Sequence, residues 1–224
     1  MMLTLLHDNL DYLLWGNLTR GQPGGLLLTL GISLAAGVLA TLGGLAGGIA
    51  LCMGGPRLCR VLNTLVQILR AIPVLMLIFW CYFLLPILFG IDIPGVLTVI
   101  AALAVINAAY LSQSVKAGID AIGDGQWRAA QALGMTRWQA LRYIILPPAL
   151  RAMLPSFVNQ WITLLKDSSL AYVVGVAEFT FVATQINNRE QVYPLQIFGL
   201  LAIGYLLLCS TLEWLGRRAG RMPA

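Results

Sequence analysis

Five long apolar runs dominate this chain and restrict it to folds that cross a lipid bilayer. Hydrophobic residues make up 59% of its 224 residues and charged residues only 10%, whereas soluble proteins contain about 45–50% and about 25%. A helix needs about 20 mostly apolar residues to cross the hydrocarbon core. The sequence therefore predicts an all-α polytopic membrane protein with five transmembrane helices, near Leu26–Met53, Leu58–Phe89, Gly95–Val115, Ala149–Val176 and Leu195–Leu215.

Basic residues follow alternate runs and predict the orientation of the chain. Arg57 and Arg60 follow the first run, five basic residues surround the segment between the third and fourth runs, and three arginines close the chain. The segment between the second and third runs carries only Asp92. Because Lys and Arg are enriched in cytoplasmic loops, we expect residues 1–22 to lie outside, residues 23–216 to form the transmembrane domain, and residues 217–224 to form a cytoplasmic basic tail. The net charge of +5 is then a feature of these loops and does not indicate nucleic-acid binding.

Polar residues inside three of the runs fall near one depth. Arg70 lies about ten residues inside the second run, which is roughly 15 Å along a helix and half of a roughly 30 Å core. Asn107 lies similarly deep in the third run, and the fourth contains Lys166, Asp167, Ser168 and Ser169. Such residues are costly in hydrocarbon and normally face a protein interior or a wet cavity. Two interpretations stay open: a solute path, or a structural cluster in which Asp167 neutralises Arg70 and Lys166.

Glycines in the first run give two overlapping GxxxG spacings, formed by Gly43, Gly44, Gly47 and Gly48. Small residues at this spacing allow close helix packing in lipid. The frequency of glycine in membrane helices explains the pattern equally well.

The sequence shows no pattern of an enzyme, a metal site or a nucleotide site. It lacks the GxxxxGK[ST] phosphate loop and a nucleophile with its base, so we expect no catalytic residues and no bound cofactor. His7 is the single histidine, and the four cysteines form no CxxC pair, which argues against a metal site and a disulfide framework. Residues 1–21 lack the basic start of a signal peptide and predict a short amphipathic surface helix.

A polar segment between the third and fourth runs carries a spaced motif. Arg128-Ala129-Ala130 is followed by Gly134 and, after nine further residues, by Ile144-Ile-Leu146-Pro147. This pattern resembles the EAA loop of importer permeases of the ATP-binding-cassette (ABC) class: Glu-Ala-Ala, three residues, Gly, nine residues, Ile-x-Leu-Pro. The resemblance implies two short cytoplasmic helices, at about residues 120–148, that dock on a separate ATPase subunit. Its implied contact residues are Arg128, Ala129, Ala130, Gly134, Leu146 and Pro147.

Further motifs in the same order resemble polar-amino-acid ABC permeases of the histidine/glutamate group, from about residue 25 to 180. They are Leu26-Leu-Leu-Thr29-Leu30, Arg70-Ala-Ile-Pro73, Ala109-Tyr110-Leu111-Ser112 with Gly118-Ile119, and Leu164-Leu-Lys166-Asp167-Ser168-Ser169-Leu170. The resemblance implies a type I ABC importer-like permease of a bacterial inner membrane, with a periplasmic N-terminus. The apolar run Ile78–Pro86 is similar to that of permeases for acidic amino acids, so glutamate or aspartate is a possible substrate.

The resemblance also implies partners. Two ATPase subunits would bind ATP and dock on the loop, an extracytoplasmic amino-acid-binding protein would deliver the solute, and a second permease chain, identical or related, would complete the path. Arg128 departs from the motif because the family has Glu there, which makes a non-identical partner permease plausible. Two alternatives stay open: a subunit of an ion-gradient-driven secondary transporter, which would usually be longer and carry inverted repeats, and a non-transporting membrane scaffold.

Overall fold

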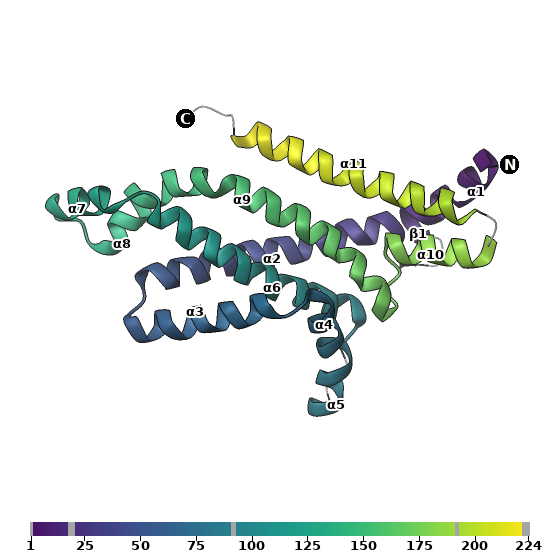
Figure 1. Cartoon of the computed structure of the whole chain (residues 1–224), viewed down its shortest axis with the longest axis horizontal. Coiled ribbons are helices and arrows are strands. Elements are labelled where there is room, and N and C mark those ends of the chain that lie inside the picture. Colours follow the sequence, from purple (N-terminus) through teal and green to yellow (C-terminus); the bar gives the residue numbers. More distant parts are fainter. Residues whose placement is uncertain (1, 18–20, 91–92, 191–192, 221–224) are drawn as a thin grey trace. The chain divides into compact units, whose positions relative to one another are not determined.

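The computed structural model describes residues 2–17, 21–90, 93–190 and 193–220, and nearly all of them are helical (Figure 1). The predicted all-α fold class is therefore confirmed. Asp92, part of the orientation argument, and residues 221–224 of the expected basic tail lie outside the described residues. The helices are α1 (Met2–Trp15), α2 (Gly25–Met53), α3 (Pro56–Ala71), α4 (Val74–Phe79), α5 (Leu85–Phe89), α6 (Gly95–Asp120), α7 (Asp124–Ala132), α8 (Arg137–Ala140), α9 (Leu146–Asp167), α10 (Phe179–Glu190) and α11 (Pro194–Gly220).

Short irregular elements join these helices. Two π-helical segments, η2 (Trp80–Leu84) and η3 (Leu141–Ile145), precede α5 and α9, and a 3-10 helix, η4 (Ser168–Val174), continues α9. Strands β1 (Gly16–Asn17) and β2 (Gln22–Pro23) pair antiparallel after α1. This small hairpin leaves the fold class unchanged.

Three helices among the described residues are long and apolar enough to cross a membrane: α2, α6 and most of α11. The second predicted run is divided, because α3 ends at Ala71 and α4 begins at Val74; the number rises to four if this broken pair is one span. Pro73 explains the break, since proline lacks an N–H and forces the preceding residue out of the helical region. Ile72 accordingly has extended backbone angles, with φ −80° and ψ 126°.

The fourth predicted run becomes α9 followed by η4, and this helix is not among those apolar enough to qualify as a span. Its charged and amide residues, including Arg151, Asn159 and Lys166, lower its hydropathy. The presence of five transmembrane helices therefore stays a prediction. The assignment to membrane proteins rests on the three long apolar helices.

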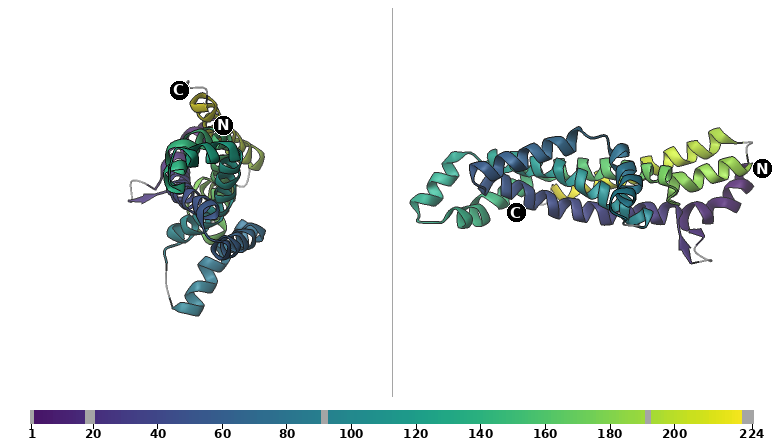
Figure 2. Two further views of the ribbon diagram at one scale, coloured as in Figure 1. Left: turned by 90° about the vertical axis from the view of Figure 1, so that its left-hand side faces the viewer. Right: turned by 90° about the horizontal axis from the view of Figure 1, so that it is seen from below.

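Contacts divide the chain into two compact units, which we describe separately. The first comprises Met1–Gly37, Pro73–Leu103 and Ile162–Leu212, and the second comprises Val38–Ile72, Ala104–Trp161 and Glu213–Ala224. In the first unit the expected N-terminal helix is present as α1, which lies beside α10 (Figure 2). Leu13 of α1 joins an apolar core with Phe179, Val182, Ala183, Ile186 and Ile197.

Glycines hold α2 close to α6 in the second unit. A Cβ atom added at Gly44 would lie 2.4 Å from the Cβ of Leu111, and one at Gly48 would lie 2.4 Å from the Cβ of Val115. These separations are far below van der Waals contact, so the helices could not approach this closely with any larger residue. The GxxxG glycines therefore serve close packing between helices.

Candidate functional site

The segment that carries the EAA-like motif folds as two short helices, α7 and α8, which lie side by side beyond the end of α6 (Figures 1 and 2). Helix α7 ends in a Schellman motif, in which the Gly134 N–H donates to the Gln131 carbonyl at 2.9 Å and the Met135 N–H donates to the Ala130 carbonyl at 3.1 Å. Gly134 has φ +78°, a conformation that L side chains rarely adopt. The two-helix form and the turn at Gly134 are as the resemblance implied.

A capping box starts the second helix of the pair. The Gln139 backbone N–H donates to the Thr136 hydroxyl at 3.3 Å, and the Thr136 N–H donates to the Gln139 side-chain oxygen at 2.9 Å. This reciprocal pair satisfies two donors that a helix start leaves open. The turn between α7 and α8 thus has a defined shape.

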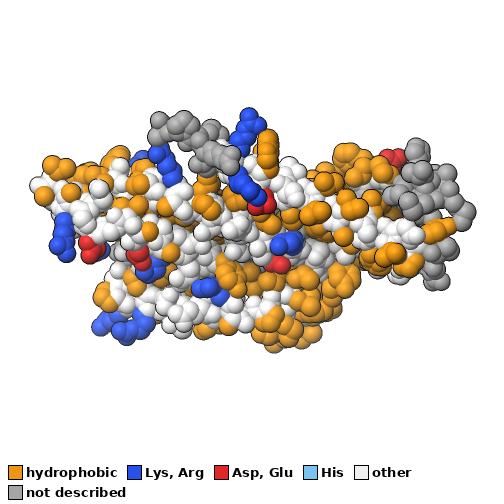
Figure 3. All heavy atoms as spheres, turned by 45° about the horizontal axis from the view of Figure 1, so that its top comes forward, with side chains coloured by type: hydrophobic (Ala, Val, Ile, Leu, Met, Phe, Trp, Pro, Cys, Tyr) orange, Lys and Arg blue, Asp and Glu red, His pale blue; other side chains and the backbone are white. Residues whose placement is uncertain are grey.

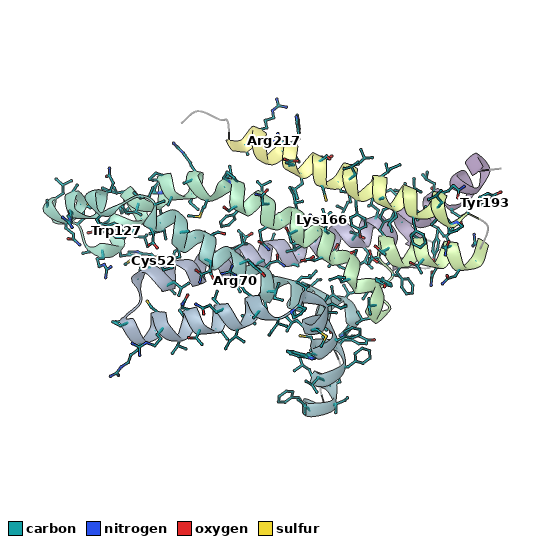
Figure 4. All side chains as sticks on the ribbon, in the orientation of Figure 1. Cys52, Arg70, Trp127, Lys166, Tyr193 and Arg217 are labelled. Carbon is teal, nitrogen blue, oxygen red and sulfur yellow. The ribbon has the colours of Figure 1, made fainter. Side chains whose placement is uncertain are left out.

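An apolar core holds the pair against the membrane helices of the second unit. Ala130 is fully buried. The core joins Val115 and Ile119 of α6 to Leu141, Ile145, Ala149 and Met153, and Trp127 of α7 packs against it (Figure 4). Through Trp127, α7 is therefore packed against residues of α6 and α9.

Large apolar side chains are exposed along α7, α8 and the following segment η3. Leu133 is 77% exposed, and Trp138 and Tyr143 are also exposed. Arg128, Ala129 and Gly134 are exposed as well. At the start of α9, Pro147 is exposed and Leu146 is half-buried. Our sequence reasoning missed the apolar residues, although their signal was available: three large hydrophobic side chains stand in a segment assigned to the cytoplasm. Exposed apolar residues with basic neighbours are typical of a surface that binds another protein.

Arg70 lies at the last turn of α3, next to the break at Pro73 (Figure 4). Its guanidinium carbon lies 4.9 Å from the centre of the Tyr110 ring, a cation–π distance. The Tyr110 hydroxyl also donates to the Arg70 carbonyl at 3.3 Å. The end of a helix leaves such carbonyls without intrahelical partners, so one tyrosine contacts both the side chain and the backbone of Arg70.

Asn107 lies on α6 one turn before Tyr110 and is fully buried. Its side-chain oxygen accepts a hydrogen bond from the Gln160 amide of α9 at 2.6 Å. Further along α6, the Gln113 amide donates to the Asn63 side chain of α3 at 3.1 Å. Asn107, Tyr110 and Gln113, spaced three residues apart, thus form a polar stripe of α6, and Arg70 of α3 contacts this stripe at Tyr110.

Lys166–Ser169 lie in the first unit, where α9 changes to the 3-10 helix η4. The Lys166 side chain is exposed and that of Asp167 is half-buried. The hydroxyls of Ser168 and Ser169 donate to the carbonyls of Leu165 and Lys166, each at 2.7 Å. The two serines thus stabilise the end of α9, and the two charged side chains are the more accessible part of this motif.

Sequence reasoning also missed Glu178, a fully buried carboxylate at the start of α10. One oxygen accepts from the Phe181 N–H at 2.8 Å; the other accepts from the Thr180 N–H at 2.9 Å and the Tyr205 hydroxyl at 3.2 Å. Burial raises the pKa of this carboxyl from 4.5 to about 7, and the backbone bonds from Thr180 and Phe181 only partly oppose the rise. Glu178 thus binds the open N–H groups of the first turn of α10, and one distant partner is Tyr205 of α11, a pairing that no local sequence pattern marks.

The chain matches a known protein family over residues 27–220, described as "Binding-protein-dependent transport system inner membrane component". Two curated relatives are similar over most of their length. The probable glutamine ABC transporter permease protein GlnP of Bacillus subtilis (strain 168) is 35% identical over 196 residues, which are 87% of this chain and 89% of that protein. The glutamate/aspartate import permease protein GltK of Escherichia coli O157:H7 is 34% identical over 209 residues, which are 89% and 92% of the two chains.

Solved structures share the fold. A crystal structure of an amino acid ABC transporter with histidines superposes with a TM-score of 0.80 at 30% identity, covering 88% of this chain and 91% of the other. An inward-facing structure of the MetNI methionine ABC transporter gives a TM-score of 0.75 at 23% identity and covers 87% and 92%. At that identity the second likeness concerns the fold alone.

Proposed function

Because this chain belongs to the family of binding-protein-dependent transport system inner membrane components, we propose that it is the membrane-spanning permease subunit of a bacterial ABC importer for a polar amino acid. The observation that carries this proposal is the match over residues 27–220, together with relatives named for glutamine and for glutamate/aspartate. Glutamine, glutamate and aspartate are therefore the first substrates to test. The match favours an importer over an ion-driven transporter or a scaffold.

The pair α7–α8 is the proposed docking surface for two ATPase subunits, one on each of two permease chains. Its support is the exposure of Leu133 at the end of α7, Trp138 of α8 and Tyr143 of η3, together with the turn fixed at Gly134. The apolar core that Trp127 of α7 packs against includes residues of α6 and α9. Binding of ATP by the partner subunits would then move membrane helices, while this chain itself binds neither ATP nor another cofactor.

Arg128 is exposed on α7, where the motif has Glu. An arginine here would favour a carboxylate of the ATPase as its partner, whereas the family's Glu would favour a basic one. We propose that the second permease chain is related to this one and carries the motif Glu, so that the two docking loops differ.

The polar stripe of α6 with Arg70 is the proposed lining of the solute path. Arg70 would attract the α-carboxylate of an amino acid, because its planar fork suits a carboxylate bidentately. Asn107 supports the path through Gln160, while Lys166 and Asp167 are further candidates in the first unit. The alternating-access cycle requires only that the ATP-bound state bind one arrangement of the helices more tightly than the other.

The proposed topology follows the distribution of arginine. Residues 1–22 and α10 would lie on the periplasmic side of the inner membrane, where a binding protein delivers the amino acid. The segment of about residues 120–148 and residues 217–224 would lie in the cytoplasm. Residues 217–220 extend α11, so the proposed tail begins as helix.

Co-purification with a tagged form of this chain tests the proposal most directly. The expected result is an ABC ATPase and a second permease chain in the complex, whose sequences decide between an identical and a related partner. Reconstituted complex should take up glutamine, glutamate or aspartate only with ATP inside the vesicles and a binding protein outside. Uptake driven by a proton or sodium gradient without ATP would contradict the proposal.

A further inference from the structure

A groove lies between α9 and α11 in the second unit. Its volume is about 380 Å³. Its lining residues on α9 are Arg151, Leu154, Pro155, Val158 and Asn159, and those on α11 are Glu213, Gly216 and Arg217. Gly216 sets its width, because a Cβ atom there would lie 2.4 Å from a methyl carbon of Val158. The two helices are therefore in contact at this point, and the groove is a built feature of their packing.

The two arginines of the groove differ in their partners. Arg217 forms an ion pair with Glu213 one turn earlier on α11. The Arg151 side chain is exposed and has no ion-pair or hydrogen-bond partner within the described ranges. The groove thus presents the unpaired guanidinium of Arg151 and the guanidinium of Arg217, which is paired with Glu213. Apolar side chains of α9 lie beside them, so the groove suits a ligand with an anionic head and a hydrocarbon chain.

The surroundings of the groove have the character of a membrane–water interface. Trp214 is largely exposed on the last turns of α11, and the Arg218 guanidinium lies 5.2 Å from its ring centre. In Figure 3, blue basic side chains lie beside orange hydrophobic ones near this end of α11. Tryptophan and arginine gather at the level of lipid headgroups, and basic pockets between membrane helices on the cytoplasmic side bind anionic headgroups.

We infer that the α9–α11 groove binds an anionic glycerophospholipid of the cytoplasmic leaflet. Arg151 and Arg217 contact the phosphate, and an acyl chain lies along Leu154 and Val158. The choice of leaflet rests on the proposed topology, whereas the groove and its charges are features of the structure itself. Glu213 limits the affinity because it competes with the phosphate for Arg217.

Native mass spectrometry of the complete purified complex tests this inference. The complex is incubated with phosphatidylglycerol or with zwitterionic phosphatidylethanolamine, and retained lipid is counted after gentle activation. We expect selective retention of phosphatidylglycerol. Arg151→Gln and Arg217→Gln should each weaken it about fivefold, the effect of about 1 kcal/mol per basic residue near a membrane surface. Glu213→Gln should strengthen retention, since it releases Arg217.

Arg60→Gln is the matched control, because Arg60 is exposed on α3 and does not line the groove. A loss in Arg60→Gln equal to that in Arg151→Gln would overturn the inference, since general surface charge would then explain it. Complete displacement by millimolar inorganic phosphate would overturn it as well, because the acyl chain would contribute nothing. Absence of retained phosphatidylglycerol from the complete complex would also overturn it. No ATP or amino acid is present, so a failure of the proposed transport would leave these results unchanged.

Discussion

At the scale of single residues, Arg70 gives the sharpest test of the solute path. Arg70→Lys keeps the charge but loses the planar fork, so we expect uptake per assembled complex to fall about tenfold, or about 1.4 kcal/mol. Arg70→Met loses both and should abolish uptake. Normal uptake per assembled complex in Arg70→Met, with a lower yield of complex, would instead assign Arg70 a structural role. The measurement is amino-acid uptake in proteoliposomes normalised to complex content.

Tyr110 should position Arg70, since its ring and its hydroxyl contact different parts of that residue. Tyr110→Phe removes the hydrogen bond to the Arg70 carbonyl but keeps the ring, and we expect a loss of about two- to tenfold in maximal uptake. Tyr110→Leu removes both contacts and should approach the effect of Arg70→Lys. Equal uptake in all three Tyr110 forms would show that the contact has no role in transport.

The raised pKa of the Glu178 carboxyl should make the stability of the folded protein depend on pH. It lies outside the five apolar runs, and its folded pKa of about 7 exceeds the ordinary value of 4.5. The folded state therefore binds the proton more tightly, so the stabilisation is complete below about pH 4.5 and is lost as the pH rises to about 7. The total change is on the order of 3 kcal/mol. We expect the melting temperature to fall between pH 5 and pH 8, and to vary much less in Glu178→Gln. An equal slope in that variant would assign the effect to other groups.

At the scale of helices, the sequence predicted where the helices lie better than where a helix is interrupted. The apolar runs located α2, α6 and α11, and Pro73 carried a readable signal for the break in the second run. The pairing of Asn107 with Gln160, and of Glu178 with Tyr205, could not be read from the sequence. Each pair joins residues far apart in the chain, and only the packed fold decides which polar groups meet. The turn at Gly134 was predictable because its cause, the left-handed backbone, is local.

The contact between α2 and α6 predicts which glycines tolerate a side chain. Gly48→Ala would place its Cβ 2.4 Å from that of Val115, so we expect a loss of about 1–3 kcal/mol from overpacking. Gly31→Ala is the control, because Gly31 lies in the same helix and a Cβ atom there would meet no atom within 4 Å. Thermal unfolding of the purified variants should separate the two. Similar melting temperatures would show that α2 and α6 can move apart without cost.

A side chain at the turn between α7 and α8 should uncouple ATP hydrolysis from the binding protein while the chain still inserts into the membrane. Gly134→Leu puts a side chain on a residue with φ +78°, which costs about 1–2 kcal/mol and distorts the docking surface. Gly125→Leu is the matched control, because Gly125 is equally unobstructed and its φ is not positive. We expect ATP hydrolysis by the complex to lose its stimulation by the binding protein in Gly134→Leu alone. Normal stimulation in that variant at full expression would remove the docking role from this turn.

At the scale of the whole molecule, the proposed orientation determines whether an ATPase can reach α7 and α8. The basic segments alternate with the others, which predicts that Asp92 faces the periplasm and Arg137 the cytoplasm. In a background with Cys52, Cys59, Cys81 and Cys209 replaced, we expect Asp92→Cys to react with an impermeant thiol reagent in intact cells. Arg137→Cys should react only after the membrane is opened, since its position on α8 is exposed. The reverse labelling would place the loop outside the cell, and both the docking proposal and the leaflet assigned to the α9–α11 groove would then fail together.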